Sequence, residues 1–201
     1  MHHSSDSGHE GWKYTKRFKH LIMTSDKRSS KWDSGDKRKA VFSPCRKWRY
    51  HIEHVWDASK PNLLWLMLNP STADENQNDP TVERCERRAR MWGFGGFEVY
   101  NIFAFRATDP ANMKAQADPV GADNDDWMIK FAKKSRDTIG VLGWGEHGKH
   151  LGRGAYVLDL LRAHDAQLHA LKLNASGHPK HPLYVGYKQG LIEISPYHSV
   201  A

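Results

Sequence analysis

The feature that most constrains the fold is a run of six apolar residues, LLWLML, at positions 63–68. Pro61-Asn62 precedes this run and Asn69-Pro70 follows it. A short apolar run between chain-breaking residues is typical of a strand that is buried on both faces, as in a parallel sheet. The sequence therefore predicts a central buried strand over residues 63–68.

Strands and helices alternate after this run. Further strands are predicted at residues 97–103, 138–143 and 168–173, and helices at residues 80–92, 123–135 and 154–163. Asp79 is a natural N-cap with Pro80 at the first helical position, and Asp123-Asn124-Asp125 is expected to cap the second helix. Such alternation predicts the α/β class, as a three-layer sandwich around a mostly parallel sheet.

The N-terminal part has a different pattern. Residues 40–43 and 48–56 alternate polar and apolar side chains on either side of Pro44-Cys45-Arg46, which predicts a β-hairpin. Residues 1–39 are polar and basic, and they are interpreted either as a solvated tail or as an arm that contacts phosphates. The expected organisation is an arm over residues 1–39 and one domain over residues 40–201.

The net charge of +7 favours a polyanionic partner such as nucleic acid. The chain contains no run of 18 apolar residues and begins without an apolar signal segment, so a cytoplasmic location is expected. Two cysteines, Cys45 and Cys85, are too few for a disulfide scaffold or a four-thiolate metal site, and both are expected to be small buried residues.

Several common functional motifs are missing. The sequence has no glycine-rich dinucleotide or triphosphate loop, no serine nucleophile elbow and no HExxH zinc motif. We therefore expect neither a cofactor nor a metal. The polar, Gly- and Pro-rich segments follow the predicted strands, where ligands of parallel sheets bind.

Five motifs in order carry a family resemblance: LNPSTAD, NDPTVERC, WGFGGFEVYNIFAFRATDP, GWGEHG and HPLYV. The chain resembles the family catalogued as domain of unknown function 1643 over roughly residues 40–185. The same motifs are similar to those of the uracil-DNA glycosylase superfamily. The similar pieces are Asn69-Pro70 after the first strand, Asn101 in the second, Trp144-Gly145 after the third, and a shortened His181-Pro182-Leu183 loop.

This resemblance implies a monofunctional DNA glycosylase that flips a base out of the helix and hydrolyses its N-glycosidic bond. It implies that Asn69 positions the attacking water, with Asp74 or Asp79 assisting. It also implies that His181 stabilises the departing base, although the neighbouring His178-Pro179 is a competing placement. Asp79 has the simpler interpretation of a helix cap.

The resemblance assigns the remaining site residues to substrate binding. Asn101 would read the base edge, and Leu183 with Tyr184 would fill the vacated stack. Phe103 would stack on the base, although core packing is the more frequent role of such a ring, and Trp144 is expected among the substrate-binding residues. Phosphates or a polar substituent are expected to be contacted by basic side chains, namely Arg106, His147, Lys149 and Lys180.

Ser71 stands where uracil-specific relatives carry a tyrosine that blocks position 5 of the base. The expected substrate is therefore a 5-substituted pyrimidine, with glucosylated hydroxymethylcytosine of phage DNA as the sharpest hypothesis and phage defence as the role. The expected partner is duplex DNA, bound by a monomer. The alternatives are a uracil or mismatch glycosylase, a non-catalytic nucleic-acid-binding module and an enzyme of nucleotide metabolism.

Overall fold

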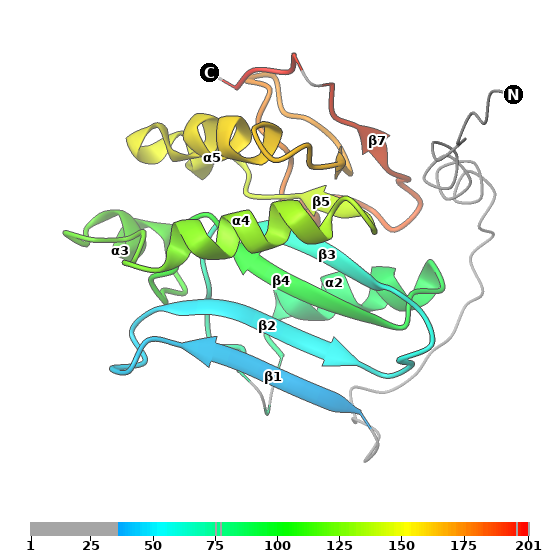
Figure 1. Cartoon of the computed structure of the whole chain (residues 1–201). Helices are drawn as coiled ribbons and strands as arrows, with labels where there is room; N and C mark the ends of the chain where they lie inside the picture. Colours follow the sequence, from blue (N-terminus) through cyan, green and yellow to red (C-terminus); the bar gives the residue numbers. More distant parts are fainter. Residues whose placement is uncertain (1–35, 75, 77, 196, 201) are drawn as a thin grey trace, which may run out of the picture.

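The computed structural model describes residues 36–74, 76, 78–195 and 197–200. Within them, seven strands form one sheet in the order β1-β2-β4-β3-β5-β6-β7 (Figure 1). The strands are β1 (Lys37–Phe42), β2 (Arg49–Val55), β3 (Asn62–Met67), β4 (Gly96–Asn101), β5 (Gly140–Leu142), β6 (Leu168–Ala170) and β7 (Ile192–Glu193). The described helices are α2 (Pro80–Met91), α3 (Pro110–Lys114), α4 (Asn124–Lys134) and α5 (Arg153–Arg162), with short 3-10 turns η1 (Glu146–Gly152) and η2 (Pro182–Tyr184).

The sheet is parallel at its centre and antiparallel at its edges. β3 pairs in parallel with β4 and β5, and β5 pairs in parallel with β6. The hairpin β1–β2 joins antiparallel beside β4, while β7 runs antiparallel to β6. The predicted α/β class and hairpin are therefore confirmed, as a mixed sheet with a parallel centre. β1 begins at Lys37, inside the predicted arm, whereas residues 1–35 lie outside the described residues.

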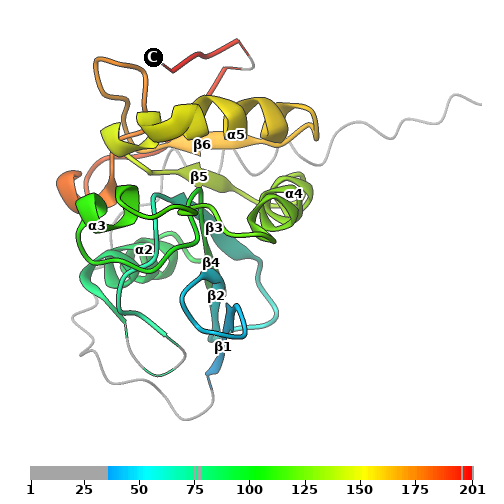
Figure 2. The ribbon, with the colours of Figure 1, turned by 90° about the vertical axis from the view of Figure 1, so that its left-hand side faces the viewer.

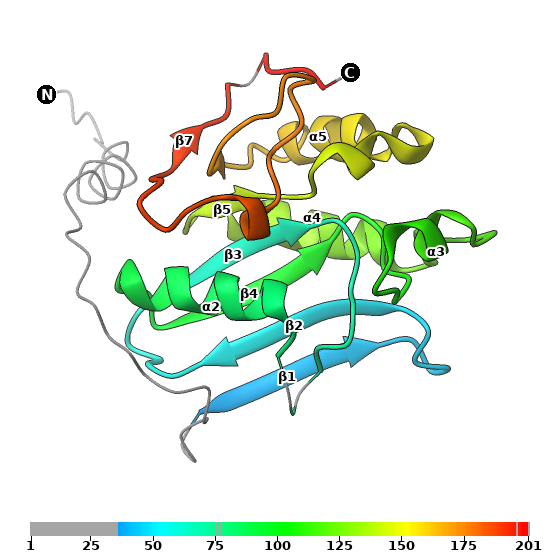
Figure 3. The same cartoon turned by 180° about the vertical axis from the view of Figure 1, so that it is seen from behind.

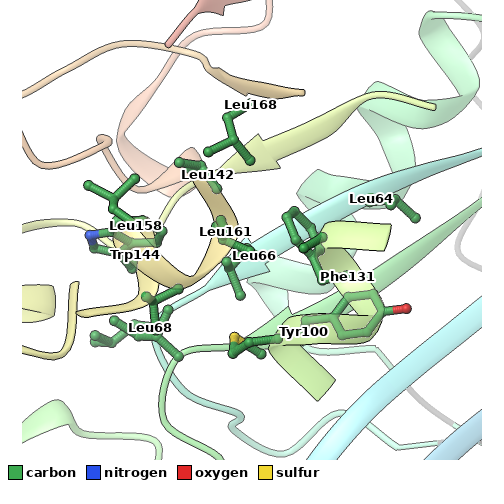
Figure 4. Close-up of a cluster of buried hydrophobic side chains, with 14 of the residues drawn as sticks. Leu64, Leu66, Leu68, Tyr100, Phe131, Leu142, Trp144, Leu158, Leu161 and Leu168 are labelled. Carbon is green, nitrogen blue, oxygen red and sulfur yellow. The ribbon is translucent and has the colours of Figure 1, made fainter. Parts of the chain in front are cut away.

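Alternation along β3 separates two apolar layers. Leu64 and Leu66 belong to the cluster formed with α4 and α5, whereas Leu63 and Trp65 belong to the cluster formed with α2. Figure 4 shows the first cluster, in which Leu64 and Leu66 lie near Phe131 of α4. Figure 3 shows α2 lying across the opposite face of the sheet. β3 is thus buried on both sides, as its unbroken apolar sequence predicts.

Local sequence explains the helix ends, with one correction. The side chain of Asp79 accepts hydrogen bonds from the backbone N–H groups of Thr81 and Val82, so the predicted cap of α2 is confirmed. Asp123 precedes α4 but makes no side-chain cap bond, so the capping predicted there is wrong in detail although the helix is present. The prediction that both cysteines are buried holds for Cys85 and is wrong for Cys45, which is exposed in the turn between β1 and β2.

The order of the central strands creates a topological switch point at β3, the place where ligands of such sheets generally bind in a crevice. From β3 the chain moves to β4 on one side, and it later returns to β5 on the other side of β3. Right-handed crossovers then place the connecting helices on opposite faces, as the two clusters of α2 and of α4 with α5 confirm. Adjacent loops therefore part at the carboxyl end of β3, and Figure 2 shows the sheet from the side with α2 and α4 flanking it.

We expect Gly148→Ala to lower the free energy of unfolding by about 1–3 kcal/mol through overpacking. A Cβ at Gly148 would lie 2.2 Å from Cδ1 of Trp144, which is 1% exposed and cannot move aside. Gly190→Ala is the matched control, because nothing lies within 4 Å of its added Cβ. Urea unfolding followed by circular dichroism measures both variants, and equal stabilities would contradict this packing.

Candidate functional site

The loops that follow β3 and β4 are joined by hydrogen bonds at the carboxyl end of the sheet. Nδ2 of Asn69 donates to the carbonyl oxygen of Ala107 at 2.7 Å, and the N–H of Ala107 donates to the carbonyl oxygen of Pro70 at 2.9 Å. Oγ of Ser71 donates to Oγ1 of Thr108 at 3.3 Å. The segment that begins with Asn69 is thereby fixed beside the loop that carries Arg106.

These bonds also orient the Asn69 amide. Its Nδ2 is engaged by two carbonyl oxygens, those of Pro70 and Ala107. Among the described residues no donor reaches its Oδ1, and the side chain is only partly buried. Asn69 therefore presents a hydrogen-bond acceptor whose direction is set by the backbone around it.

Asn101 ends β4 in register with Met67 of β3, and it is 1% exposed. Its Nδ2 has no hydrogen-bond partner among the described residues. A buried amide N–H without a partner costs about 1–3 kcal/mol, so a group that is retained in this state is a candidate ligand contact. Asn124 of α4 anchors this strand end, because its Nδ2 donates to the carbonyl oxygens of Asn101 and Ile102.

The structure separates the two competing histidines. His178 is 1% exposed, and its Nδ1 accepts a hydrogen bond from Nε1 of Trp144 at 3.0 Å. His181 is only partly buried and lies at the start of η2, on the loop that follows β6. The N–H of Gly145 donates to the carbonyl oxygen of Pro179 at 2.8 Å, which brings the loops after β5 and β6 together. His178 is thus a packing partner of Trp144, whereas His181 lies on the loop at the carboxyl end of β6.

The surroundings of His181 keep its imidazole neutral. Burial lowers the pKa of His181 to about 4, Asp79 opposes this shift and His147 adds to it. The backbone N–H of Leu183 donates to Nδ1 at 3.4 Å. A neutral ring that accepts at Nδ1 carries its proton on Nε2. His181 is therefore a neutral donor at neutral pH rather than a cation.

Basic groups flank this histidine. Nζ of Lys114, in α3, lies 3.0 Å from Nδ1 of His147, which is exposed in η1. Burial lowers the pKa of His147, and the charges of Lys114 and Lys149 lower it further. His147 thus accepts from Lys114 in its neutral form. Lys114 was not predicted from the sequence, since a lysine at a helix end is ordinarily solvated.

The predicted wedge has one exposed member. Tyr184 is 75% exposed, whereas Leu183 is partly buried beside it. Two arginines of α2 hold the chain just beyond η2: Arg84 and Arg88 both donate to the carbonyl oxygen of Val185. The exposed Tyr184 therefore lies on a turn that these two arginines of α2 hold in place.

Arg49 is a site residue that sequence reasoning missed. It is 1% exposed in β2, and its NH1 donates to the carbonyl oxygen of Ala73, in the loop after β3. Burial lowers the pKa of Arg49 to about 10, while the carboxylates of Asp79 and Asp74 oppose that shift. An arginine in an alternating strand is expected to face solvent, so no sequence signal marked this one.

Two predicted substrate contacts lie in the core. Phe103 is 0% exposed and Trp144 is 1% exposed, both in the cluster with α4 and α5 (Figure 4 labels Trp144). Both rings pack in the core, which for Phe103 is the alternative to stacking on the base, and their assignment to substrate binding stays a prediction. Their apolar neighbours explain this placement, because each ring fills the layer beneath the strand-end loops.

Asp74, Arg106 and Lys180 lie on the strand-end loops without being buried in that core. Oδ1 of Asp74 accepts from the N–H of Asn76 at 2.8 Å, and the guanidinium of Arg106 lies 5.0 Å from the Phe42 ring centroid. Within residues 36–200, apart from the few undescribed positions, no three His, Cys, Asp or Glu side chains are grouped as a metal site. No helix of the described chain is long and apolar enough to cross a membrane.

A family model described as "Protein of unknown function (DUF1643)" matches residues 49–183. The chain belongs to the DUF1643 family. The match begins at Arg49 and ends at Leu183, so it spans β2 to β6 and ends in η2, two residues after His181. No curated protein and no solved structure matches the chain.

The lowered pKa of His181 predicts a specific acid sensitivity. The unfolded chain binds a proton near pH 6.5 and the folded chain near pH 4, so stability is full above pH 6.5 and falls as the pH drops towards 4. We expect this histidine to account for about 1–2 kcal/mol of the loss between pH 7 and pH 5. Urea unfolding at both pH values should show a smaller loss for His181→Gln than for the unaltered protein, and equal losses would contradict the neutral imidazole.

Removing the buried arginine should loosen the loop that it holds. We expect Arg49→Met to cost about 3 kcal/mol, because it leaves the Ala73 carbonyl and two nearby carboxylates without their counterpart. Hydrogen exchange of peptides covering residues 69–79 should accelerate in this variant. The control is Arg136→Met at an exposed position, for which we expect a change within about 0.5 kcal/mol. Unchanged exchange in residues 69–79 would refute the role of Arg49.

Proposed function

We propose that this DUF1643 protein is a monofunctional DNA N-glycosylase with a fold of the uracil-DNA glycosylase kind. The observation that carries the proposal is the set of polar groups at the carboxyl ends of β3, β4 and β6. Asn69 offers a free acceptor, Asn101 offers a buried unpartnered donor, and His181 offers a neutral donor. Cleavage of a glycosidic bond to a base needs these three kinds of group.

The reaction breaks the C1′–N bond of a flipped nucleotide, and the bonding electrons leave with the base. Positive charge develops on the sugar and negative charge on the base. Water adds its oxygen to C1′, gives up a proton, and leaves an abasic deoxyribose and the free base. A catalyst must therefore hold a water on one side of the sugar and stabilise an anion on the other.

In this proposal Asn69 and Asp74 act on the attacking water. Oδ1 of Asn69 accepts a hydrogen bond from the water, and its direction is fixed by the two carbonyls on Nδ2. An amide is a poor base, so the carboxylate of Asp74, five residues further on, receives the proton. Asp79 is committed to the α2 N-terminus through two backbone N–H groups, which leaves it a structural role.

His181 and Asn101 contact the base in this proposal. The Nε2–H of His181 donates to a carbonyl oxygen of the leaving base. A neutral donor suits this role because it does not have to lose a proton once the base has left. Nδ2 of Asn101 finds its missing partner in the edge of the base. Ser71 leaves space beside position 5, which supports a 5-substituted pyrimidine and, as the sharpest choice, glucosylated hydroxymethylcytosine of phage DNA.

The surroundings of the crevice suit duplex DNA. Tyr184, at 75% exposure, is available to enter the stack that the flipped base vacates, with Leu183 behind it. Donors for backbone phosphates come from basic side chains near these loops, namely Lys114, His147, Arg106, Lys149 and Lys180. The net charge of +7 adds a general attraction to a polyanion. A role in cytoplasmic phage defence is consistent with this substrate.

The test uses matched duplexes that carry one cytosine, uracil, hydroxymethylcytosine or glucosylated hydroxymethylcytosine, followed by alkaline cleavage of abasic sites. We expect strand breaks only with the glucosylated base. Asn69→Ala and His181→Ala should each lower the rate about 10²- to 10³-fold, since each removes one preorganised contact. Cleavage with uracil would overturn the argument from Ser71 while leaving the glycosylase proposal intact.

His164→Ala is the matched control for His181→Ala. His164 lies just beyond α5, where its Nδ1 is paired with the carbonyl oxygen of Leu160, so its removal should leave the rate unchanged. No cleavage of any duplex, together with binding that weakens steeply with salt, would reject the enzyme and leave a nucleic-acid-binding module.

A further inference from the structure

A second polar site lies away from the strand-end loops, on the α4 face of the sheet. A pocket of about 330 Å³ is lined by residues of β1, β2, β4 and α4. In Figure 1, α4 lies on the viewer's side of the sheet, and β1 and β2 lie below it. The lining residues are Lys39, His51, Glu53, Tyr100, Trp127, Lys130, Lys133 and Lys134. It shares no residue with the proposed glycosylase crevice.

Residue spacing on α4 and the register of the strands bring the lining residues of this pocket together. On α4, Trp127, Lys130 and Lys134 are spaced by three and four residues, which places them along one side of the helix. Across the strands, Lys39 is in register with Glu53, and Glu53 is in register with Glu98. The helix thus contributes a wall of lysines, and the strands contribute the floor.

The acidic group beneath the floor is already neutralised. Glu98 accepts from Nε2 of His51 at 3.0 Å, from the hydroxyl of Tyr100 at 2.7 Å and from Nζ of Lys134 at 2.8 Å. Burial acts to raise the pKa of Glu98, but these hydrogen bonds outweigh it and hold the pKa well below its usual range. The carboxylate is therefore occupied and does not cancel the charge of the remaining lysines.

Three lysines of the pocket lack a counter-ion. No carboxylate of the described residues pairs with Lys39, Lys130 or Lys133, and all three are exposed. Nζ of Lys130 lies 4.0 Å from the Trp127 ring centroid, a cation–π contact that holds the ammonium at the pocket wall. Glu53 is the one further carboxylate of the lining, and its Oε1 accepts from Asn62.

A buried group in the same place also lacks a partner. His51 is 5% exposed, and its ring stacks on Trp127 with centroids 5.1 Å apart. Its Nδ1 is buried without a hydrogen-bond partner among the described residues. Solvated lysines alone would need no explanation, but an unsatisfied histidine nitrogen beneath them indicates a site that is completed by something else.

We propose that this pocket binds a phosphate group, carried by a free phosphate ester or by a nucleic-acid backbone. Lysine acts on phosphate as a point charge, and three ammonium groups against one carboxylate match the double negative charge of a phosphate monoester. The volume of about 330 Å³ exceeds that of a phosphate ion and accommodates the sugar attached to it. The site is independent of glycosidic chemistry, so it stands or falls separately from the proposed enzyme.

Isothermal titration calorimetry tests the pocket with pyrophosphate, thymidine 5′-monophosphate, unphosphorylated thymidine and a single-stranded thymidine oligonucleotide. We expect the two small phosphates to bind and thymidine not to bind. Lys130→Ala combined with Lys133→Ala should weaken phosphate binding about tenfold or more. Both lysines are exposed on α4, so the fold should be retained, as thermal unfolding would verify.

The charge-matched control is Lys172→Ala combined with Lys188→Ala, at exposed positions outside the pocket, which should bind as the unaltered protein does. A parallel loss of oligonucleotide affinity in the Lys130 and Lys133 variant assigns the site to the nucleic-acid backbone. Loss for the small phosphates alone assigns it to a free ester. Absence of phosphate binding, or equal binding by both double variants, would overturn the proposal.

Discussion

The structure depends on the burial of β3 between two apolar layers. Five of its six residues are buried, with Leu64 and Leu66 facing α4 and α5 and with Leu63, Trp65 and Met67 facing α2. Full burial of such side chains contributes about 1.5–3 kcal/mol each, so the five together contribute on the order of 10 kcal/mol of hydrophobic free energy. β4 and β5 pair with β3 on its two sides, and the helices pack against its two faces.

The same arrangement explains why the polar residues gather at one edge. Connections on either side of β3 leave towards opposite faces, so the loops diverge at its carboxyl end. Asn69 follows β3 at that point, and a hydrogen bond from its Nδ2 to the carbonyl oxygen of Ala107 ties it to the loop after β4. Gly143 permits the close approach of the loop after β6, because a Cβ there would lie 3.0 Å from Pro182 and 3.1 Å from Met67. The positions of these loops are therefore fixed by backbone contacts to a rigid sheet.

The two histidines of the proposed sites have different surroundings. At His181 desolvation dominates, which leaves a neutral ring with a fixed proton. His51 lies 3.0 Å from the carboxylate of Glu98, which is also paired with Lys134. In the proposed reaction His181 donates to a developing anion, whereas His51 lies beneath the lysines of the proposed phosphate pocket. One histidine thus lies at the carboxyl ends of the strands and the other on the α4 face of the sheet.

The sequence determined the order and type of the main elements, because their signals are local. The apolar run of β3, the Asp79-Pro80 start of α2 and the alternation in β2 each need only neighbouring residues. It also marked Asn69, Asn101 and His181, since each lies at a strand end or in a distinctive loop. The short elements α3 and β7 escaped prediction, since five and two residues carry too little periodicity.

Only the tertiary structure decided what each polar or aromatic side chain meets. It paired His178 with Trp144, left His181 on the loop after β6, and placed Phe103 in the core. It also directed Arg49 beneath the loop of Ala73 and set the lysines of α4 opposite β1 and β2. These contacts join residues that lie far apart along the chain, and local sequence carries no information about such pairs. The physical reason is that burial and hydrogen bonding depend on which surfaces the packed layers bring together.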